Sequence, residues 1–544
     1  MAVLNFKGKA FVQNYHLQVK YHQLIPRKEK SLTDKVSLHD NLIIHGDNLK
    51  ALKALLPTYA GKIKCIYIDP PYNTGNEKWV YNDNVNSPMM QDWLGKVVDK
   101  EDLTRHDKWL CMMMPRLKLL RELLREDGAI FLTIDDNEVH HLRMLMDEVF
   151  GPDNFVAQII WQKVYSPRMD AKGYSVDHDH ILAYRRSDEY RVKPVAFQQN
   201  LAQFTEVDAA TGQRYRRRSL RKEGKNSRRQ DRPNLFYRLE APDGTDILPI
   251  RPDGSEGCWR WAPHRYEAAK ARGLLDWVKG PKTWQVYVKQ YYNEDATRPP
   301  STLWPHSQVG HNHEANEEIK MIFGESIFPN PKPVRLIKHI ISLMTDPEED
   351  DIVLDSFAGS GTTAHASLAV NEEEGGNVRF ILVECEDYAD RITAERVRGV
   401  IKGVPRAKDE SLRKGLGGCF SYFELGPPIE MESILEGDDL PSYKELARYI
   451  FYTATGEEFD EKAVDEKQNF IGESREYLVY LFYKPDIDYL KATALTLDRA
   501  NALGPHKDKR RLVFAPTKYL DQEHLDQLRI DFAQLPFEIY QLVK

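Results

Sequence analysis

The chain has 544 residues, a formal net charge of −7 and five widely separated cysteines. One core cannot serve a chain of this length, so we expect roughly two to four domains. The negative charge excludes a uniformly basic nucleic-acid binder, and the cysteine spacing argues against a disulfide framework or a zinc site. No apolar run approaches a membrane span and the amino terminus lacks a signal-peptide core, so a cytosolic protein is expected.

The first regular pattern is a strand, a helix and a second strand. Residues 1–40 show no clear period and are expected to form an irregular arm. An apolar stretch then ends in Gly46-Asp47, leucines follow at helical spacing, and a second apolar run covers 63–68. This order predicts parallel pairing of the two strands. Asp47 is predicted with equal weight to reach a ligand or to cap the helix.

The second strand runs into Asp69-Pro70-Pro71-Tyr72. Proline fixes its own φ and cannot donate to a strand ladder, so the strand must stop here. A carboxylate, carbonyl groups and an aromatic face are then held at the carboxyl edge of a sheet, where open α/β sheets bind ligands. A planar amine there could donate its hydrogens to Asp69 and the Pro70 carbonyl while its ring stacks on Tyr72. For the tetrapeptide alone, an ordinary strand-ending loop is an equal alternative.

The next stretch predicts further elements of the same sheet. Residues 79–102 are interpreted as a binding loop, 103–125 as a helix and 129–134 as a strand. The Asp135-Asp136 pair is predicted to cap the following helix rather than to act in catalysis. Residues 178–180, His-Asp-His, resemble a metal site, but no third ligand follows at a supporting spacing, so no metal is predicted.

A basic and aromatic segment follows between about residues 190 and 300. From Arg214 to Arg232 there are ten Lys or Arg side chains and two acidic ones, and Trp and Tyr residues come next among Pro-Gly turns. This combination favours DNA binding over a solvated loop. The predicted DNA-contacting residues are Arg214, Arg216, Arg217, Arg218, Arg221, Lys222, Arg228 and Arg229.

A second strand and turn lie in the later part of the chain. The strand 352–355 meets Gly359-Ser360-Gly361, which opens an Ala-rich helix, and the strand 379–384 ends in an acid. Glycines let a backbone approach a ligand closely, and an acid at that position typically accepts hydrogen bonds from ribose hydroxyls. The missing third glycine opposes a nicotinamide dinucleotide, and no phosphate loop for nucleotide hydrolysis occurs.

Taken together, these motifs resemble the β class of DNA amino-methyltransferases, in which the target motif precedes the cofactor motif. Segments such as 105–110, 127–137 and 512–519 are similar to the modification (Mod) subunit of type III restriction-modification systems. The resemblance implies an α/β fold: a circularly permuted, Rossmann-like methyltransferase sheet with an inserted target-recognition domain and a small α/β C-terminal domain. The implied divisions are 1–40, 41–190, 191–305, 306–402 and 403–544.

The resemblance also implies roles for individual residues. Asp69, Pro70, Pro71 and Tyr72 would hold a flipped adenine for N6 methylation. The cofactor S-adenosyl-L-methionine would contact Asp47, Phe328, Lys332, Pro333, Asp355, Phe357, Gly359, Gly361 and Glu384. Glu386 competes with Glu384 for the ribose, because the final residue of the strand is ambiguous.

The implied partners are double-stranded DNA, a second copy in a homodimer and an ATP-dependent restriction (Res) subunit. Four alternatives stay open: a stand-alone enzyme on adenine N6 or cytosine N4, methylation of RNA, methylation of a protein glutamine, and a DNA-recognition scaffold with little turnover. The cysteines offer no covalent nucleophile at the predicted pocket, so direct methyl transfer is expected.

Overall fold

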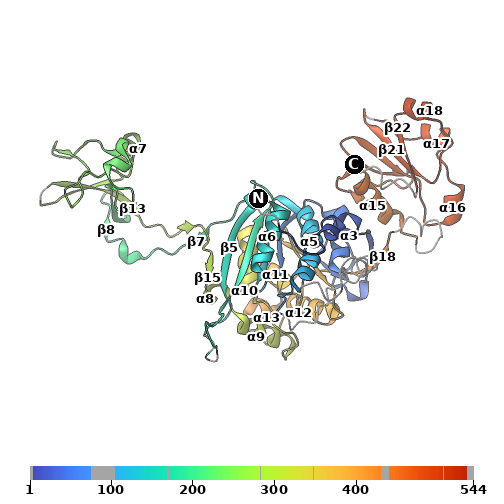
Figure 1. Ribbon diagram of the computed structural model, residues 1–544, viewed down its shortest axis with the longest axis horizontal. Coiled ribbons are helices and arrows are strands. Elements are labelled where there is room, and N and C mark those ends of the chain that lie inside the picture. Colours follow the sequence, from blue (N-terminus) through green and yellow to red (C-terminus); the bar gives the residue numbers. More distant parts are fainter. Residues whose placement is uncertain are drawn as a thin grey trace. The chain divides into compact units, whose positions relative to one another are not determined.

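The computed structural model describes residues 4–74, 105–429 and 440–535, except positions 168, 170, 282, 347 and 507. The expected binding loop at 79–102, the acidic segment 430–439 and the closing segment 537–542 lie outside the described residues. The chain divides into two compact units, Met1–Lys193 with Ser301–Lys544, and Pro194–Pro300. Figure 1 follows both along the sequence.

The larger unit is built on a ten-stranded sheet. Its strands, in spatial order, are β1 (His22–Pro26), β18 (Ser421–Pro428), β2 (Leu42–His45), β17 (Arg379–Glu384), β16 (Ile352–Asp355), β3 (Ile63–Ile68), β4 (Leu124–Ile134), β6 (His178–Arg185), β5 (Phe155–Gln162) and β15 (Leu303–Trp304). Neighbours from β18 to β4 are parallel. The strands β2, β17, β16 and β3 therefore present their carboxyl ends at one edge.

Both faces of this sheet are apolar, because successive strand residues point to opposite sides. Leu42, Ile44 and Ile381 join a core with α3 (Asn48–Tyr59), α5 (Arg105–Leu123) and α6 (Val139–Phe150). Ile43 and Leu382 join a second core with α11 (Thr362–Glu374) and α12 (Glu395–Lys402). Burial on both sides explains why these strands are continuous apolar runs in the sequence.

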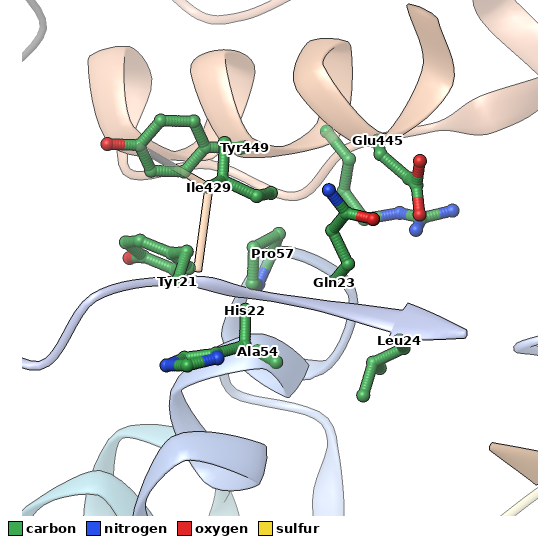
Figure 2. A pocket seen from close by; sticks show the side chains of 10 residues that line it. Tyr21, His22, Gln23, Leu24, Ala54, Pro57, Ile429, Glu445 and Tyr449 are labelled. Atoms are coloured by element: carbon green, nitrogen blue, oxygen red, sulfur yellow. The ribbon is translucent and has the colours of Figure 1, made fainter. Parts of the chain in front are cut away.

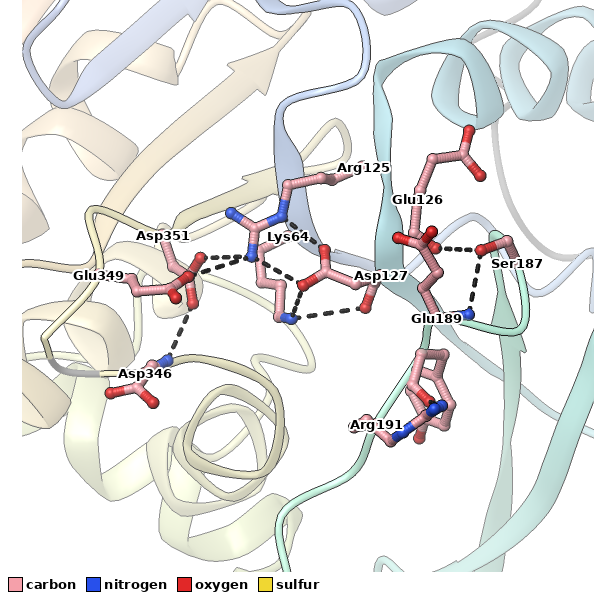
Figure 3. Close-up of polar contacts among 11 residues, drawn as sticks. Lys64, Arg125, Glu126, Asp127, Ser187, Glu189, Arg191, Asp346, Glu349 and Asp351 are labelled. Carbon is pink, nitrogen blue, oxygen red and sulfur yellow. Dashed lines mark hydrogen bonds and ion pairs between the residues drawn. The ribbon is translucent and has the colours of Figure 1, made fainter.

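The amino ends of the central strands are joined by an ion-pair network (Figure 3). Arg125, in β4, contacts Asp127 at 2.5 Å and Asp351, just before β16, at 2.9 Å. Lys64 of β3 reaches Asp127 at 2.6 Å. The network therefore links three neighbouring strands at the end of the sheet opposite the predicted site.

The smaller unit has its own antiparallel sheet and core. Its strands are β12 (Leu275–Lys279), β13 (Trp284–Tyr291), β9 (Arg214–Ser219) and β8 (Glu206–Val207), and its helix is α7 (Pro263–Ala271). Trp259, Val286 and Val288 are among its buried residues. At its base, β7 (Val195–Ala196) pairs antiparallel with β14 (Thr297–Arg298), so the chain enters and leaves the unit side by side.

Several boundaries differ from expectation. The irregular arm at 1–40 is wrong, because it contains α1 (Lys9–Val12), α2 (Tyr15–Gln18) and β1, which pairs with β18. Val12 and Val19 are buried in the main core, and that burial orders the segment. The expected core boundary near residue 402 comes too early, because β18 is also a strand of the central sheet.

The remaining C-terminal part forms a small α/β arrangement. Its sheet is β19 (Phe470–Glu473), β20 (Tyr477–Leu481), β21 (Arg510–Ala515) and β22 (Ile530–Gln534), beside α15 (Tyr443–Thr455). This part has an apolar core that includes Ile450, Leu481 and Phe514. Among the described residues, no helix combines the length and hydropathy needed to cross a membrane.

Candidate active site at the carboxyl edge of the sheet

Asp69 lies directly beyond the buried strand β3 and has two side-chain partners. The hydroxyl of Thr133, in the neighbouring strand β4, donates to Oδ1 at 2.6 Å. The ammonium of Lys332 forms an ion pair with Oδ2. Both partners come from other elements, so the orientation of this carboxylate depends on the tertiary fold.

The two prolines fix the backbone after Asp69. The indole of Trp109 in α5 donates to the Pro71 carbonyl at 2.7 Å. In the part of the chain that the structure describes, no donor reaches the Pro70 carbonyl. One carbonyl therefore anchors the loop, and the other has no hydrogen-bond donor among the described residues.

Tyr72 is held at its hydroxyl end. That hydroxyl donates to Asp179 of β6 at 3.3 Å, and Asp179 in turn pairs with Lys163 at 2.6 Å. Burial raises the pKa of the Tyr72 hydroxyl well above its usual range, so it stays neutral. The Lys332 ammonium lies 5.0 Å from the centre of the Tyr72 ring. Ring, carboxylate and ammonium thus gather at one place.

The cofactor-type turn begins at Asp355, the last residue of β16. Its two carboxylate oxygens accept from the Phe357 N–H at 3.0 Å and from the Thr363 hydroxyl at 2.5 Å. Burial raises the pKa of Asp355 to about 7. Both hydrogen bonds connect Asp355 to the turn itself and to the helix that follows it, so the Asp355 carboxylate stabilises the conformation of the turn.

The two glycines are required by the shape of the turn. Gly359 has φ 53° and Gly361 has φ 81°, a region that side chains rarely adopt. A Cβ atom at Gly359 would lie 3.2 Å from the Phe328 ring, and one at Gly361 would lie 3.0 Å from the Thr393 carbonyl. The turn is therefore packed closely under Phe328.

Glu384 is the final residue of β17 and is fully buried. Its carboxylate accepts from the backbone N–H groups of Gly359 at 2.7 Å, Cys385 at 2.9 Å and Glu386 at 3.0 Å. Burial raises the pKa of Glu384 to about 7. The strand end that was ambiguous in the sequence is therefore Glu384, which also holds the glycine turn in place.

Asp47 caps α3, as one of the two alternatives predicted. It accepts from the Lys50 N–H at 3.0 Å and contacts the buried guanidinium of Arg116 at 3.3 Å. The neighbouring Asn48 amide donates to the Ser356 carbonyl at 2.9 Å and accepts from Arg116. Arg116 thus joins α5 to the end of β2, next to the glycine turn.

Lys332 connects the two halves of the site. Its ammonium pairs with Asp69, and its carbonyl accepts from the Thr362 hydroxyl at 3.3 Å, at the start of α11. Pro333 follows as the N-cap of α10 (Val334–Met344). Because β3 and β16 are parallel neighbours, the target motif and the glycine turn lie at adjacent strand ends.

Several site residues escaped the sequence reasoning. Thr133 lies in β4 and Lys163 directly follows β5, and nothing local marks either residue. Asp179 in β6 drew attention only as part of a possible metal site. Arg116 carries a signal, since a charged residue lies on the apolar face predicted for the helix. The Asp135-Asp136 interpretation is wrong, because Glu138 is the N-cap residue of α6 and Asp136 pairs with His180 at 2.8 Å.

In the smaller unit, the predicted basic residues fall into two groups. Arg217 pairs with Asp276 at 2.6 Å and Arg229 with Glu256 at 2.9 Å, so acidic neighbours compensate both charges. Arg214, Arg216 and Arg218 are exposed, and within the described ranges they form no ion pair. Arg221 donates to the Ile250 carbonyl at 2.9 Å; no ion pair is found for Lys222 or Arg228 in the same ranges.

A small pocket elsewhere in the larger unit is lined by residues of β1, α3 and α15 (Figure 2). Tyr21 and Tyr449 face each other there, with ring centres 4.8 Å apart. None of the motif residues lines this pocket. It is therefore separate from the candidate active site.

A mixed sheet whose central strands are parallel, with a Pro-Pro-Tyr loop and a glycine turn at adjacent strand ends, defines a Rossmann-like methyltransferase fold. The family model described as DNA methylase matches residues 63–395. The chain belongs to this DNA methylase family.

Three relatives show which kinds of DNA methylase the chain is similar to. The chain is 29% identical to the type III StyLTI Mod subunit of Salmonella typhimurium, over 98% of this chain and 84% of that one. It is 29% identical to the type III EcoPI Mod subunit of Escherichia phage P1, over 79% of this chain and 73% of that one. It is 34% identical to the type II methyltransferase M.KpnI of Klebsiella pneumoniae, over 65% and 82%. The resemblance to Mod subunits is thereby confirmed.

Proposed function

We propose that this DNA methylase transfers a methyl group from S-adenosyl-L-methionine to N6 of a flipped adenine, as the Mod subunit of a type III restriction-modification system. One observation carries the proposal. The Lys332 ammonium contacts the Asp69 carboxylate, and its carbonyl accepts from Thr362, which directly follows the glycine turn, so the target loop and the cofactor turn belong to one site.

The target pocket suits a planar amine. An adenine N6 group between Asp69 and the Pro70 carbonyl would donate one hydrogen to each. A carboxylate oxygen has more than one lone pair, so Asp69 can accept from adenine while Thr133 and Lys332 keep it oriented. Tyr72, fixed through Asp179, offers its ring for stacking, which offsets part of the cost of extruding the base.

The cofactor turn suits a nucleoside linked to an amino acid. Its glycine backbone allows close approach, Phe328 supplies an aromatic wall, and Glu384 retains acceptor capacity beside its N–H donors. We assign Phe357, Gly359 and Gly361 to the methionine end and Glu384 to the ribose. Asp47, together with Arg116, remains a proposed contact for the adenine base of the cofactor, in addition to capping α3.

When bound, the cofactor supplies an electrophilic methyl group. The lone pair of adenine N6 is normally delocalised into the ring and is a poor nucleophile. Hydrogen bonds to Asp69 and the Pro70 carbonyl favour a more tetrahedral nitrogen and direct its lone pair toward the methyl carbon. The N6 nitrogen would gain the methyl group as the bond between that methyl group and the cofactor sulfur breaks. The extra proton on the nitrogen would pass to the Asp69 carboxylate and from there to water, and no covalent enzyme intermediate is needed. Positioning of the two reactants supplies much of the acceleration.

The unit Pro194–Pro300 is the proposed target-recognition domain. Arg214, Arg216 and Arg218 are its best phosphate-contacting candidates, because no acidic side chain of the described residues forms an ion pair with them. A homodimer and a Res partner are proposed from the kinship with Mod subunits. The cytosolic location stays a prediction of the sequence. Adenine is favoured over cytosine by Asp at the first position of the target motif.

The proposal is tested by Asp69→Ala. Tritiated methyl transfer to mixed-sequence DNA should fall to background, because the amine loses its carboxylate acceptor, while cofactor affinity measured by calorimetry stays within about threefold, under 1 kcal/mol. Asp188→Ala changes an exposed acid far along the chain from the motifs and serves as the control. Chromatography of the methylated nucleosides identifies the base. Retained transfer in Asp69→Ala, or N4-methylcytosine as product, would contradict the assignment.

A further inference from the structure

We propose that His106, Glu138 and His141 form a binding site for a divalent transition-metal ion such as Zn²⁺, next to the Asp69–Tyr72 loop. His106 lies in the first turn of α5, and Glu138 and His141 lie at the start of α6. The site is independent of the methyl-transfer residues and goes beyond the proposed function.

The three side chains converge on one point. His106 Nδ1 lies 2.7 Å from one oxygen of the Glu138 carboxylate, and His141 Nδ1 lies 2.8 Å from the other. The donor atoms all lie within 4.8 Å of one another. Tetrahedral Zn²⁺ with bonds of about 2.0–2.1 Å needs donors roughly 3.3 Å apart. To admit the ion, the two histidine–carboxylate distances would widen by about half an ångström, and donor atoms at the 4.8 Å limit would close by about 1.5 Å through side-chain rotation.

The three side chains differ in burial, so the site would be closed on the Glu138 side and open to solvent on the histidine side. The Glu138 side chain is 0% exposed, whereas those of His106 and His141 are 32% and 25% exposed. Burying a carboxylate is costly unless a positive charge compensates it. Two imidazole nitrogens with one carboxylate oxygen form a donor set that suits Zn²⁺ and its neighbours better than Mg²⁺ or Ca²⁺.

Asn73 supplies a second observation at the same place. It follows Tyr72 directly, is fully buried with φ 56°, and its side-chain nitrogen donates to Glu138. Its side-chain oxygen is buried and has no hydrogen-bond partner among the described residues. Rotation of this amide would present that oxygen as a fourth ligand. A bound ion would then fix the residue next to Tyr72 to both α5 and α6.

A second cluster, Asp136, His178 and His180, also has donor atoms within 4.8 Å. Its chemistry is less suitable, because both ring nitrogens of His180 have partners, Asp136 at 2.8 Å and the Gln158 amide at 3.0 Å. Its carboxylate is 62% exposed, so water already solvates it. The experiment must therefore show that the ion binds to His106, Glu138 and His141 and not to this second cluster.

The experiment uses the full chain, free of tags and of metal. After equilibrium dialysis against ZnCl₂, elemental analysis should find one Zn²⁺ per chain, and Co²⁺ should give the visible absorption of four-coordinate N/O ligation without thiolate bands. His141→Ala should weaken Zn²⁺ binding at least tenfold. His140→Ala is the matched control, because His140 is the adjacent residue on α6 and is not among the three ligands. His178→Ala should also retain the ion.

Three results would overturn the proposal: no stoichiometric Zn²⁺, unchanged binding in His141→Ala, or loss of the ion in His178→Ala. If His141→Ala fails to fold, X-ray absorption of the Zn²⁺-loaded wild type decides instead. Two imidazoles with oxygen ligands are expected, and a sulfur ligand would contradict the site. Because no readout depends on turnover, failure here leaves the methyl-transfer proposal unaffected.

Discussion

At the scale of single residues, Lys332 has a partner that the family resemblance did not imply. The family resemblance assigned it to the cofactor, whereas its ammonium pairs with Asp69 and lies over Tyr72. Its side chain is 11% exposed, so the ion pair is largely shielded from water. A shielded cation beside the acceptor carboxylate holds that carboxylate in one orientation.

Replacing this ammonium should therefore affect turnover more than cofactor binding. We expect Lys332→Met to lower kcat at least tenfold, about 1.4 kcal/mol, with the cofactor Kd changed by less than threefold. Lys338→Met is the matched control, since Lys338 lies on α10, which begins two residues after Lys332, and pairs with the exposed Glu373. A large rise in the cofactor Kd with normal kcat would return Lys332 to the cofactor.

The proposed roles of Glu384 and Glu386 in cofactor binding can be distinguished by single substitutions. Glu384 accepts three backbone N–H bonds, and glutamine offers one oxygen in place of two. Glu384→Gln should weaken cofactor binding at least tenfold in calorimetry, whereas Glu386→Gln should leave it near wild type. The reverse order would assign the ribose contact to Glu386.

The pH dependence of stability follows from the same group. Burial raises the pKa of Glu384 from 4.5 to about 7, so the folded state holds this proton to higher pH than the unfolded chain does. Its contribution to stability is therefore present below about pH 4.5 and is lost as the pH rises through about 7. The free energy of unfolding should fall more steeply between about pH 4.5 and 7 in the wild type than in Glu384→Gln.

At the scale of elements, the two ends of the central strands have different roles. The carboxyl ends carry loops with ligand-binding groups, and the amino ends are tied together by charge (Figure 3). Arg125 is the centre of that network, since it contacts both Asp127 and the fully buried side chain of Asp351. The network therefore stabilises the strand order on which the active site depends.

Loss of this arginine should be costly. Arg125→Met leaves Asp351 buried without its cation, and we expect a loss of about 2 kcal/mol in the free energy of unfolding, measured with urea. Arg186→Met is the comparison, because Arg186 pairs with Glu126, which is 59% exposed. A change of at most about 0.5 kcal/mol is expected there. Equal losses would show that burial of Asp351 does not decide the energy.

At the scale of the whole molecule, the proposed recognition unit and the active-site residues belong to separately packed units. Pro194–Pro300 has its own sheet and apolar core, and its entry and exit are paired at Ala196 and Thr297. A connection of this kind lets the unit be exchanged without breaking the main sheet. That arrangement fits an insertion whose sequence varies with the DNA site.

Removal of the unit tests this separation. In a variant that joins Ala196 to Thr297 through Asn-Gly, the paired strands would close as a hairpin with a two-residue turn. We expect a cooperative unfolding transition and cofactor affinity near that of the full chain, because the active-site residues all lie in the other unit. Site-specific DNA methylation should be lost. Retained sequence-specific transfer would place recognition elsewhere in the chain.

The sequence by itself determined the local features: the strand that stops at Pro70, the glycine turn after Asp355 and the acid that ends the next strand. These depend on backbone preferences and on neighbouring residues, so they can be read from a short window. Only the tertiary structure decided which side chains serve them. Lys332 meets Asp69 across 263 residues, and Thr133 and Asp179 reach the target loop from β4 and β6. The reason is strand order, β16-β3-β4-β6, which brings distant residues to one edge and leaves no mark in the sequence around them.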